Sequence, residues 1–162
     1  MGHEIGSGGD RIREFRNDDV AQVVVILREA PEAAQWPETE LRSMAYLTGL
    51  RAFVTESAAG ITGVAIGRQM GEEAEILNLA VRVSARRRGR GKALVDRMLD
   101  EFAEQGVSRV FLEVRESNAI AVGFYEKLGF RQVGLRRDYY QAPAESAKVM
   151  ELRVGKSTEP PR

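Results

Sequence analysis

The chain has 162 residues, of which 43% are apolar and 30% charged, and its 24 basic and 24 acidic side chains balance. These values predict one folded domain with its own core rather than a disordered chain. The absence of cysteine excludes disulfides, thiol catalysis and zinc–thiolate sites, and no apolar run approaches the ~20 residues of a membrane span.

We expect residues 1–10 to form a flexible leader, because they are rich in glycine and lack the apolar core of a signal peptide. His3, the only histidine, lies in this leader, so a histidine-based acid/base or metal site is not expected. Without a targeting signal, the default location is the cytoplasm.

The hydrophobic pattern predicts a single α/β domain over residues 11–153 and a frayed tail over residues 154–162. Strands are expected at 12–15, 51–57, 61–70, 72–83, 109–114, 130–140 and 148–152. Helices are expected at about 18–30, 38–50, 93–105 and 118–128. This order predicts a mixed, mostly antiparallel sheet of about six or seven strands, flanked by about four helices.

A stretch rich in glycine and arginine lies between a predicted strand and a predicted helix. Its sequence is Arg86-Arg87-Arg88-Gly89-Arg90-Gly91-Lys92. Glycine lets the backbone approach a ligand closely, and the first N–H groups of a helix have no internal partner. Together with the helix dipole and the arginines, these donors predict a phosphate or pyrophosphate site.

Other interpretations of this stretch are open. A nucleic-acid patch would use the same arginines, although the chain has no net charge and the stretch lacks interleaved aromatics. A dinucleotide fingerprint is matched only in part, because Leu94 stands where a third glycine or alanine is needed. The P-loop spacing is absent. The stretch could also be an ordinary basic loop before a helix.

Two residues outside this stretch are candidates for acid–base chemistry. Glu113 interrupts an apolar strand, which fits either a cleft or a solvated strand end paired with Arg115. Tyr125 lies on the apolar face of a short helix and fits either a site or the core. Nearby, Asn118 fits a helix cap as well as a ligand contact.

The chain also resembles the GCN5-related N-acetyltransferase (GNAT) superfamily. The block Leu77-Asn78-Leu79-Ala80-Val81, followed by Arg86-x-x-Gly89-x-Gly91, resembles its acetyl-CoA signature. Residues 112–119, 124–130 and 136–140 are similar to the ribosomal-protein-alanine, or RimI-type, branch. The resemblance implies a single GNAT-like domain that uses acetyl-CoA as co-substrate and no metal.

The resemblance also implies roles for individual residues. Backbone groups of Leu79, Ala80 and Val81 would bind the pantetheine and thioester, Glu113 would accept a proton and Tyr125 would donate one. The remaining coenzyme A contacts would come from Arg86, Arg87, Arg88, Gly89, Arg90, Gly91, Lys92 and Asn118. An α-amino group has a pKa of about 7.7–8.0 and tyrosine one of about 10, which suits this base and this acid in direct transfer.

The acceptor implied by the resemblance is a protein N-terminus, in particular the alanine of a ribosomal protein, with Trp36 and Tyr139 as candidate substrate contacts. The branch usually has Pro-Trp-Ser between its first two helices, whereas here Gln35-Trp36-Pro37 lies in a longer loop. The segment 141–147 also departs from the usual pattern.

Alternatives for the function are therefore a lysine side chain or a small amine as acceptor, or a coenzyme A-binding domain without catalysis. We expect a monomer or homodimer, with no direct nucleic-acid or membrane partner.

Overall fold

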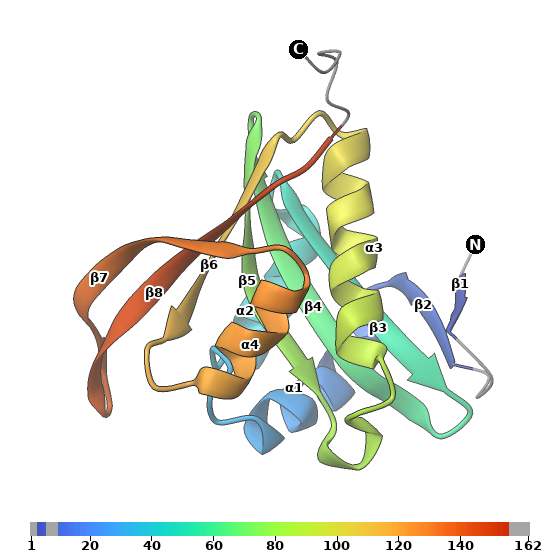
Figure 1. Ribbon diagram of the computed structural model, residues 1–162. Helices are drawn as coiled ribbons and strands as arrows, with labels where there is room; N and C mark the ends of the chain where they lie inside the picture. Colours follow the sequence, from blue (N-terminus) through green and yellow to red (C-terminus); the bar gives the residue numbers. More distant parts are fainter. Residues whose placement is uncertain (1–2, 6–9, 156–162) are drawn as a thin grey trace.

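The computed structural model describes residues 3–5 and 10–155, so predictions for residues 1, 2, 6–9 and 156–162 lie outside the described residues. One eight-stranded sheet is covered by helices on both faces (Figure 1). Its strands are β1 (His3–Ile5), β2 (Asp10–Glu14), β3 (Leu50–Ser57), β4 (Gly60–Met70), β5 (Glu73–Val81), β6 (Arg109–Arg115), β7 (Arg131–Gln141) and β8 (Ala144–Arg153). The helices are α1 (Val20–Glu29), α2 (Glu38–Ser43), α3 (Arg90–Glu104) and α4 (Ala119–Lys127).

The strands lie in the order β1-β2-β3-β4-β5-β6-β8-β7, and every pair is antiparallel except β5 with β6. This arrangement confirms the predicted α/β class with a mixed, mostly antiparallel sheet and four helices. None of the described helices is long and apolar enough to cross a membrane.

The N-terminal region has more structure than the expected leader. β1 pairs with the outer edge of β2 and brings the sheet to eight strands, one more than the upper end of the prediction. Asp10 already belongs to β2, and its buried carboxylate forms an ion pair with Arg90 at the start of α3. This contact joins residues 80 positions apart, which no local pattern reveals.

Three predicted boundaries were wrong. The helix expected at 38–50 ends at Ser43 and continues only as a 3₁₀ turn, because Gly49 turns the chain with a φ of +83° before β3. Helix α3 begins at Arg90 rather than Ala93, so the turn before it is shorter than expected. We call residues 86–92 the glycine turn. The last hairpin has only Ala142 and Pro143 between its strands, where a longer loop was expected.

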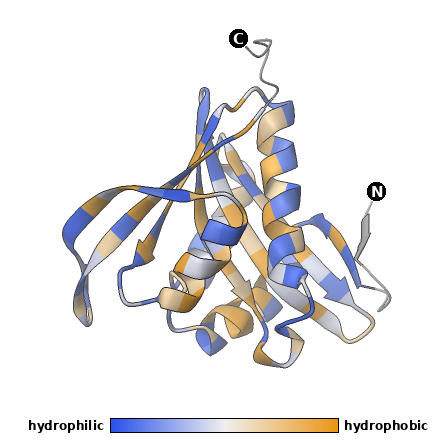
Figure 2. Cartoon of the chain, viewed as in Figure 1, coloured by the Kyte–Doolittle hydropathy of each residue, from blue (hydrophilic) through white to orange (hydrophobic). Residues whose placement is uncertain are grey.

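The sheet separates two hydrophobic cores. Helices α3 and α4 cover one face, and α1 and α2 cover the other. Figure 2 shows hydrophobic and hydrophilic residues alternating along α3, as expected for a helix with one buried face. That face consists of Leu94, Val95, Met98 and Phe102.

Glycines in β4 allow α3 to lie close to the sheet. A Cβ atom on Gly67 would lie 2.7 Å from Cζ of Phe102 and 3.0 Å from Sδ of Met98, and one on Gly63 would lie 3.0 Å from Cδ1 of Leu94. Close packing of α3 here fixes the direction in which its N-terminus, at the glycine turn, faces the sheet.

The sheet opens between β5 and β6. These strands pair from Glu73 with Arg109 to Ile76 with Leu112 and then diverge, although β5 stays paired with β4 and β6 with β8. Figure 1 shows the two strands as a V with α4 beside its open end. We call the space between residues 77–81 of β5 and 113–115 of β6 the opening.

The packing of α3 on β4 predicts the effect of adding one methyl group. Gly67→Ala should lower the free energy of unfolding by about 1–3 kcal/mol, because the methyl group overpacks the contact with Phe102. Gly123→Ala is the matched control: its Cβ meets no atom within 4 Å, so it should leave stability unchanged or raise it by up to about 1 kcal/mol. Urea unfolding of both variants tests this, and equal effects of the two substitutions would contradict the packing described.

Candidate active site

A bulge shapes the β5 side of the opening. The β4–β5 register shifts at Leu77, which has no partner in β4, before Asn78 pairs with Ile66. The buried Asn78 side chain donates a 2.7 Å hydrogen bond from Nδ2 to the carbonyl oxygen of Ala34, in the loop between α1 and α2. The strand that borders the opening therefore also holds this loop in place.

Beyond the bulge, residues 79–81 present one backbone edge to the opening. They pair with β4 on the other side, and β6 has diverged from them. Buried backbone groups need partners, so this edge is suited to an extended ligand that carries amides of its own. Leu79, Ala80 and Val81 were predicted to bind in this way, and that role stays a prediction.

The glycine turn exposes a series of backbone donors. Arg87 and Gly89 both have positive φ, of 64° and 76°, and Gly89 is the N-cap of α3. Among the described residues, no acceptor is found for the N–H groups of residues 87–92, and the first intrahelical bond runs from Ala93 to Gly89. A helix N-terminus with such unpartnered donors favours an anion.

The basic side chains of this turn divide into two groups. Arg86 donates to the carbonyl oxygen of Val81 and lies 3.6 Å from the Glu32 carboxylate, while Arg90 is buried against Asp10. Arg87 and Arg88 are exposed and have no carboxylate partner in the described part of the chain. These two side chains are therefore the ones available to an anionic ligand.

Helix α4 lies beside this turn at Phe124. A Cβ on Gly91 would lie 3.6 Å from Cζ of Phe124 and 3.8 Å from Cγ2 of Val81, so α3, α4 and β5 converge there. The Asn118 side chain accepts a 3.2 Å hydrogen bond from the N–H of Ala121 and caps α4. The capping interpretation of Asn118 is thus confirmed, and a coenzyme A contact stays a prediction.

Glu113 is the first residue of β6 beyond its pairing with β5, and its side chain is only 13% exposed. Its partner is Arg136 on β7, with Nε 3.0 Å from Oε1, and not Arg115, which binds Glu145 instead. The Tyr139 hydroxyl also lies close to Glu113, and its interaction with this carboxylate is the main reason why the pKa of Tyr139 rises to about 12.

A second carboxylate lies near Glu113 on the same face of the sheet. Glu75, on β5, is half-buried and forms no ion pair within the described ranges. Burial raises its pKa, and the negative charge of Glu113 raises it further. Two carboxylates therefore lie together on this face of the sheet, with Arg136 and Arg68 as neighbouring cations.

Tyr125 lies on the opposite face, in the core under α4. Its ring makes edge contacts with Phe124 at 5.1 Å and Phe130 at 5.6 Å between centroids. Burial raises the pKa of its hydroxyl, which keeps it protonated at neutral pH. Glu113 thus lies beside the opening on one face of the sheet and Tyr125 lies in the core on the other face, and their joint role in one site stays a prediction.

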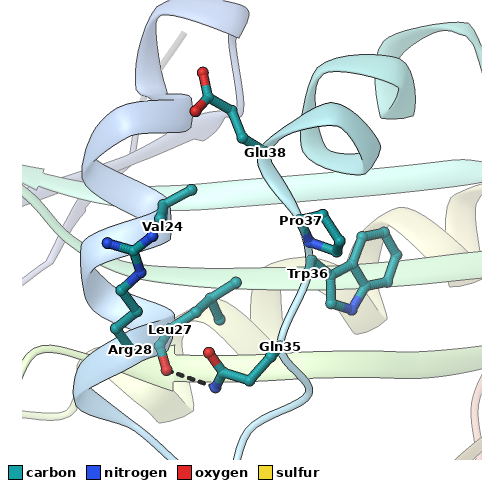
Figure 3. A pocket seen from close by; sticks show the side chains of 7 residues that line it. All are labelled: Val24, Leu27, Arg28, Gln35, Trp36, Pro37 and Glu38. Carbon is teal, nitrogen blue, oxygen red and sulfur yellow. Dashed lines mark hydrogen bonds between the residues drawn. The ribbon is translucent and has the colours of Figure 1, made fainter.

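Trp36 lies in the loop between α1 and α2. Figure 3 shows its ring on the side of this loop away from α1, while Gln35 points back and donates a 2.7 Å hydrogen bond to the Leu27 carbonyl oxygen. Between α1 and this loop is a cavity of about 280 Å³, lined by Val24, Leu27, Arg28, Gln35, Trp36, Pro37 and Glu38. Trp36 therefore belongs to a loop whose position depends on Gln35 and Asn78.

Comparison with known proteins identifies the family of this chain. A model of the acetyltransferase (GNAT) family matches residues 14–130, well over half of the chain and a stretch that includes the glycine turn, Glu113 and Tyr125. The chain belongs to the acetyltransferase (GNAT) family. Members of this family use acetyl-CoA, and the donors at the turn and at the β5 edge fit such a ligand.

Similar members of the GNAT family are RimI-type enzymes, as the resemblance predicted. The [ribosomal protein bS18]-alanine N-acetyltransferase of Escherichia coli K12 is 41% identical over 85 residues, which are 51% of this chain and 57% of that protein. The N-alpha-acetyltransferase RimI of Mycobacterium tuberculosis is 39% identical over 97 residues, 59% and 60% of the two chains. The matches therefore span little more than half the length of these relatives.

The fold extends further than the sequence match. The crystal structure of the ribosomal-protein-S18-alanine N-acetyltransferase from Escherichia coli superposes with a TM-score of 0.80 and 30% identity, covering 94% of this chain and 99% of that one. The structural match thus includes parts of the chain that the 85-residue sequence match leaves out.

Three residues of this site were not singled out from the sequence. Asn78 is a polar residue within an apolar strand, the same signal that drew attention to Glu113. Arg136 stands in a block that supported the resemblance but received no role. Glu75 offered no signal beyond its charge, because its neighbours depend on the pairing of β5 with β6.

The left-handed conformation of the turn predicts a selective effect on the donor. Gly89→Ala should raise the dissociation constant of coenzyme A about five- to thirty-fold, because a side chain at this φ costs about 1–2 kcal/mol and the turn shifts to relieve it. Gly106→Ala, at the other end of α3, has a φ of +84° and equally open surroundings. It should lose similar stability and bind coenzyme A normally, which calorimetry can measure.

Proposed function

We propose that this protein transfers the acetyl group of acetyl-CoA directly to a protein N-terminal α-amino group, with the N-terminal alanine of a ribosomal protein as the favoured acceptor. The observation that carries this proposal is the placement of Glu113 and Tyr125 on opposite faces of one opening. The names of the similar RimI-type proteins support the acceptor.

The residues divide the chemistry between the two faces. Glu113 takes a proton from the acceptor ammonium, directly or through a water molecule, and the neutral amine nitrogen then attacks the thioester carbonyl carbon. A backbone N–H at the β5 edge stabilises the charge that develops on the carbonyl oxygen. As the C–N bond forms and the C–S bond breaks, Tyr125 gives its proton to the departing thiolate. The amide nitrogen loses its second proton, which restores the Tyr125 hydroxyl, so that the one proton released overall is the one taken by Glu113.

The donor would be held mainly by backbone groups. The N–H groups of residues 87–92 and the side chains of Arg87 and Arg88 face the pyrophosphate, and residues 79–81 pair with the pantetheine amides. Arg90 contributes its N–H rather than its guanidinium, because Asp10 binds that side chain.

Substitution of the two proposed catalytic residues tests their roles. Glu113→Gln and Tyr125→Phe should each lower kcat about 10²–10⁴-fold and leave the KM for acetyl-CoA within about two-fold, because each removes a proton transfer and no donor contact. The exposed Glu116→Gln and Tyr46→Phe make the same chemical changes elsewhere and should have no effect. Normal turnover in both site variants would remove the assigned roles.

The proton donor also predicts a pH dependence. Burial raises the pKa of Tyr125, so the hydroxyl stays protonated beyond the ordinary tyrosine value of about 10. At saturating substrates, kcat should therefore not fall between about pH 8 and pH 10. A fall over this range that is abolished in Tyr125→Phe would contradict the proposed environment of the acid.

A panel of acceptors tests the substrate class. Coenzyme A release should be observed with peptides that begin with Ala, Ser or Met, strongest for Ala, and should be lost when the N-terminus is blocked and only lysines are free. The departure of the loop around Trp36 from the family pattern supports a second candidate, a lysine or small-amine acceptor. Release only with lysine-containing peptides or polyamines would favour that candidate.

A further inference from the structure

Two side chains from an irregular segment of β7 cover the proposed base. Between Arg136 and Tyr140, three residues of β7 stand opposite a single residue of β8, and Asp138 has a φ of 51°. From this bulge, Arg136 pairs with Glu113 at 3.0 Å, and the Tyr139 hydroxyl lies close enough to the same carboxylate for its pKa to be raised by it. The carboxylate that must meet the acceptor amine is therefore already paired with a cation of the protein.

The two partners of this ion pair differ in their exposure. The side chain of Arg136 is 60% exposed, whereas that of Glu113 is 13% exposed. Solvated ion pairs stabilise a structure only weakly, because water screens the charges and a long side chain loses freedom when it is fixed. Arg136 can thus move into solvent readily, whereas the mostly buried Glu113 stays where it is and then needs another cation.

A cation is needed near Glu113 whenever Arg136 has moved away. The titratable groups that face Glu113 are Glu75 on β5 and Arg136, Tyr139 and Tyr140 on β7, and its neighbour on β8 is the apolar Val149. Without Arg136, the cation that remains near these two carboxylates is Arg68 on β4, which stands beside Glu75 and not beside Glu113. An incoming ammonium group restores the balance, and a neutral ligand does not.

We propose that Arg136 is a positioning residue that acts as a cationic placeholder, paired with Glu113 until the ammonium group of the acceptor displaces it. The inference rests on the proposed function in requiring a protonated amine as acceptor. Binding exchanges one cation for another, so Glu113 keeps a counter-ion throughout. The acetylated product has no charge at this nitrogen, and Arg136 then returns to Glu113 and favours product release.

The opposite role is that Arg136 holds the acceptor peptide, and the two roles predict changes of opposite sign. If Arg136 is a placeholder, Arg136→Gln removes a competitor and the acceptor binds more tightly. If Arg136 holds the peptide, the same substitution weakens binding.

The experiment measures how an alanine-initiated peptide binds to the complex of the protein with coenzyme A, by calorimetry. Arg136→Gln should lower the dissociation constant about two- to five-fold, the range expected for an exposed ion pair. Arg136→Lys keeps the charge and should lie closer to the unsubstituted protein. Arg137→Gln makes the same change of charge at an exposed neighbour that forms no ion pair in the described part, and should have no effect.

A double-mutant cycle separates competition from a general structural effect. In a Glu113→Gln background there is no carboxylate for Arg136 to occupy, so Arg136→Gln should no longer change peptide affinity. An equal effect in both backgrounds, weaker binding or unchanged affinity in the single variant would each overturn the proposal.

The ion pair can also be observed without any acceptor. The side-chain Nε–H resonance of Arg136, assigned by its loss in Arg136→Gln, should move in Glu113→Gln and should move similarly when L-alaninamide is added. A resonance whose chemical shift stays the same in both cases would overturn the placeholder proposal, even if the chosen peptide does not bind. Failure of the unsubstituted protein to bind any free-amine peptide, with this resonance behaving as expected, would instead contradict the proposed function.

Discussion

The separation of β5 from β6 after Ile76 and Leu112 is the constraint on which the site depends. Each strand keeps its other neighbour, so the sheet remains intact while one edge of β5 loses its partner. Backbone groups in that position must be satisfied by something other than the sheet. The same departure from regular pairing places Glu113 at the margin of the opening, with Tyr125 on the other face. The proposed ligand contacts and the proposed base thus both depend on one local break in the sheet.

The two sides of the opening are built from interactions of different strength. Fixed backbone geometry forms the donor side, where the turn at Gly89 and the packed N-terminus of α3 leave little freedom. Side-chain contacts hold the acceptor side: Asn78 with Ala34, and the exposed pair of Arg136 with Glu113. Because the exposed Arg136 pair is weak, we expect the β7 part of the acceptor side to rearrange during turnover, while the buried Asn78 contact and the donor side stay in place.

Local sequence patterns predicted the parts of this structure that depend on local chemistry. Apolar periodicity predicted α3 and the central strands, and a carboxylate within an apolar strand drew attention to Glu113. The ion pairs of Arg90 and Arg136 could not be predicted, because they depend on how distant strands are registered and on a bulge in β7. The length of α2 was overestimated because helix propensity was followed past the turn at Gly49.

The central claim is that the opening and the glycine turn receive the donor through backbone groups. A titration of the isotopically labelled protein with coenzyme A, followed by backbone amide NMR, tests it most directly. We predict that the largest shifts fall on residues 79–81, where alternate backbone groups point away from β4 to the opening, and on residues 87–92, whose N–H groups have no acceptor within the described chain. Shifts concentrated on β7 or on the loop around Trp36, with these amides unchanged, would contradict it.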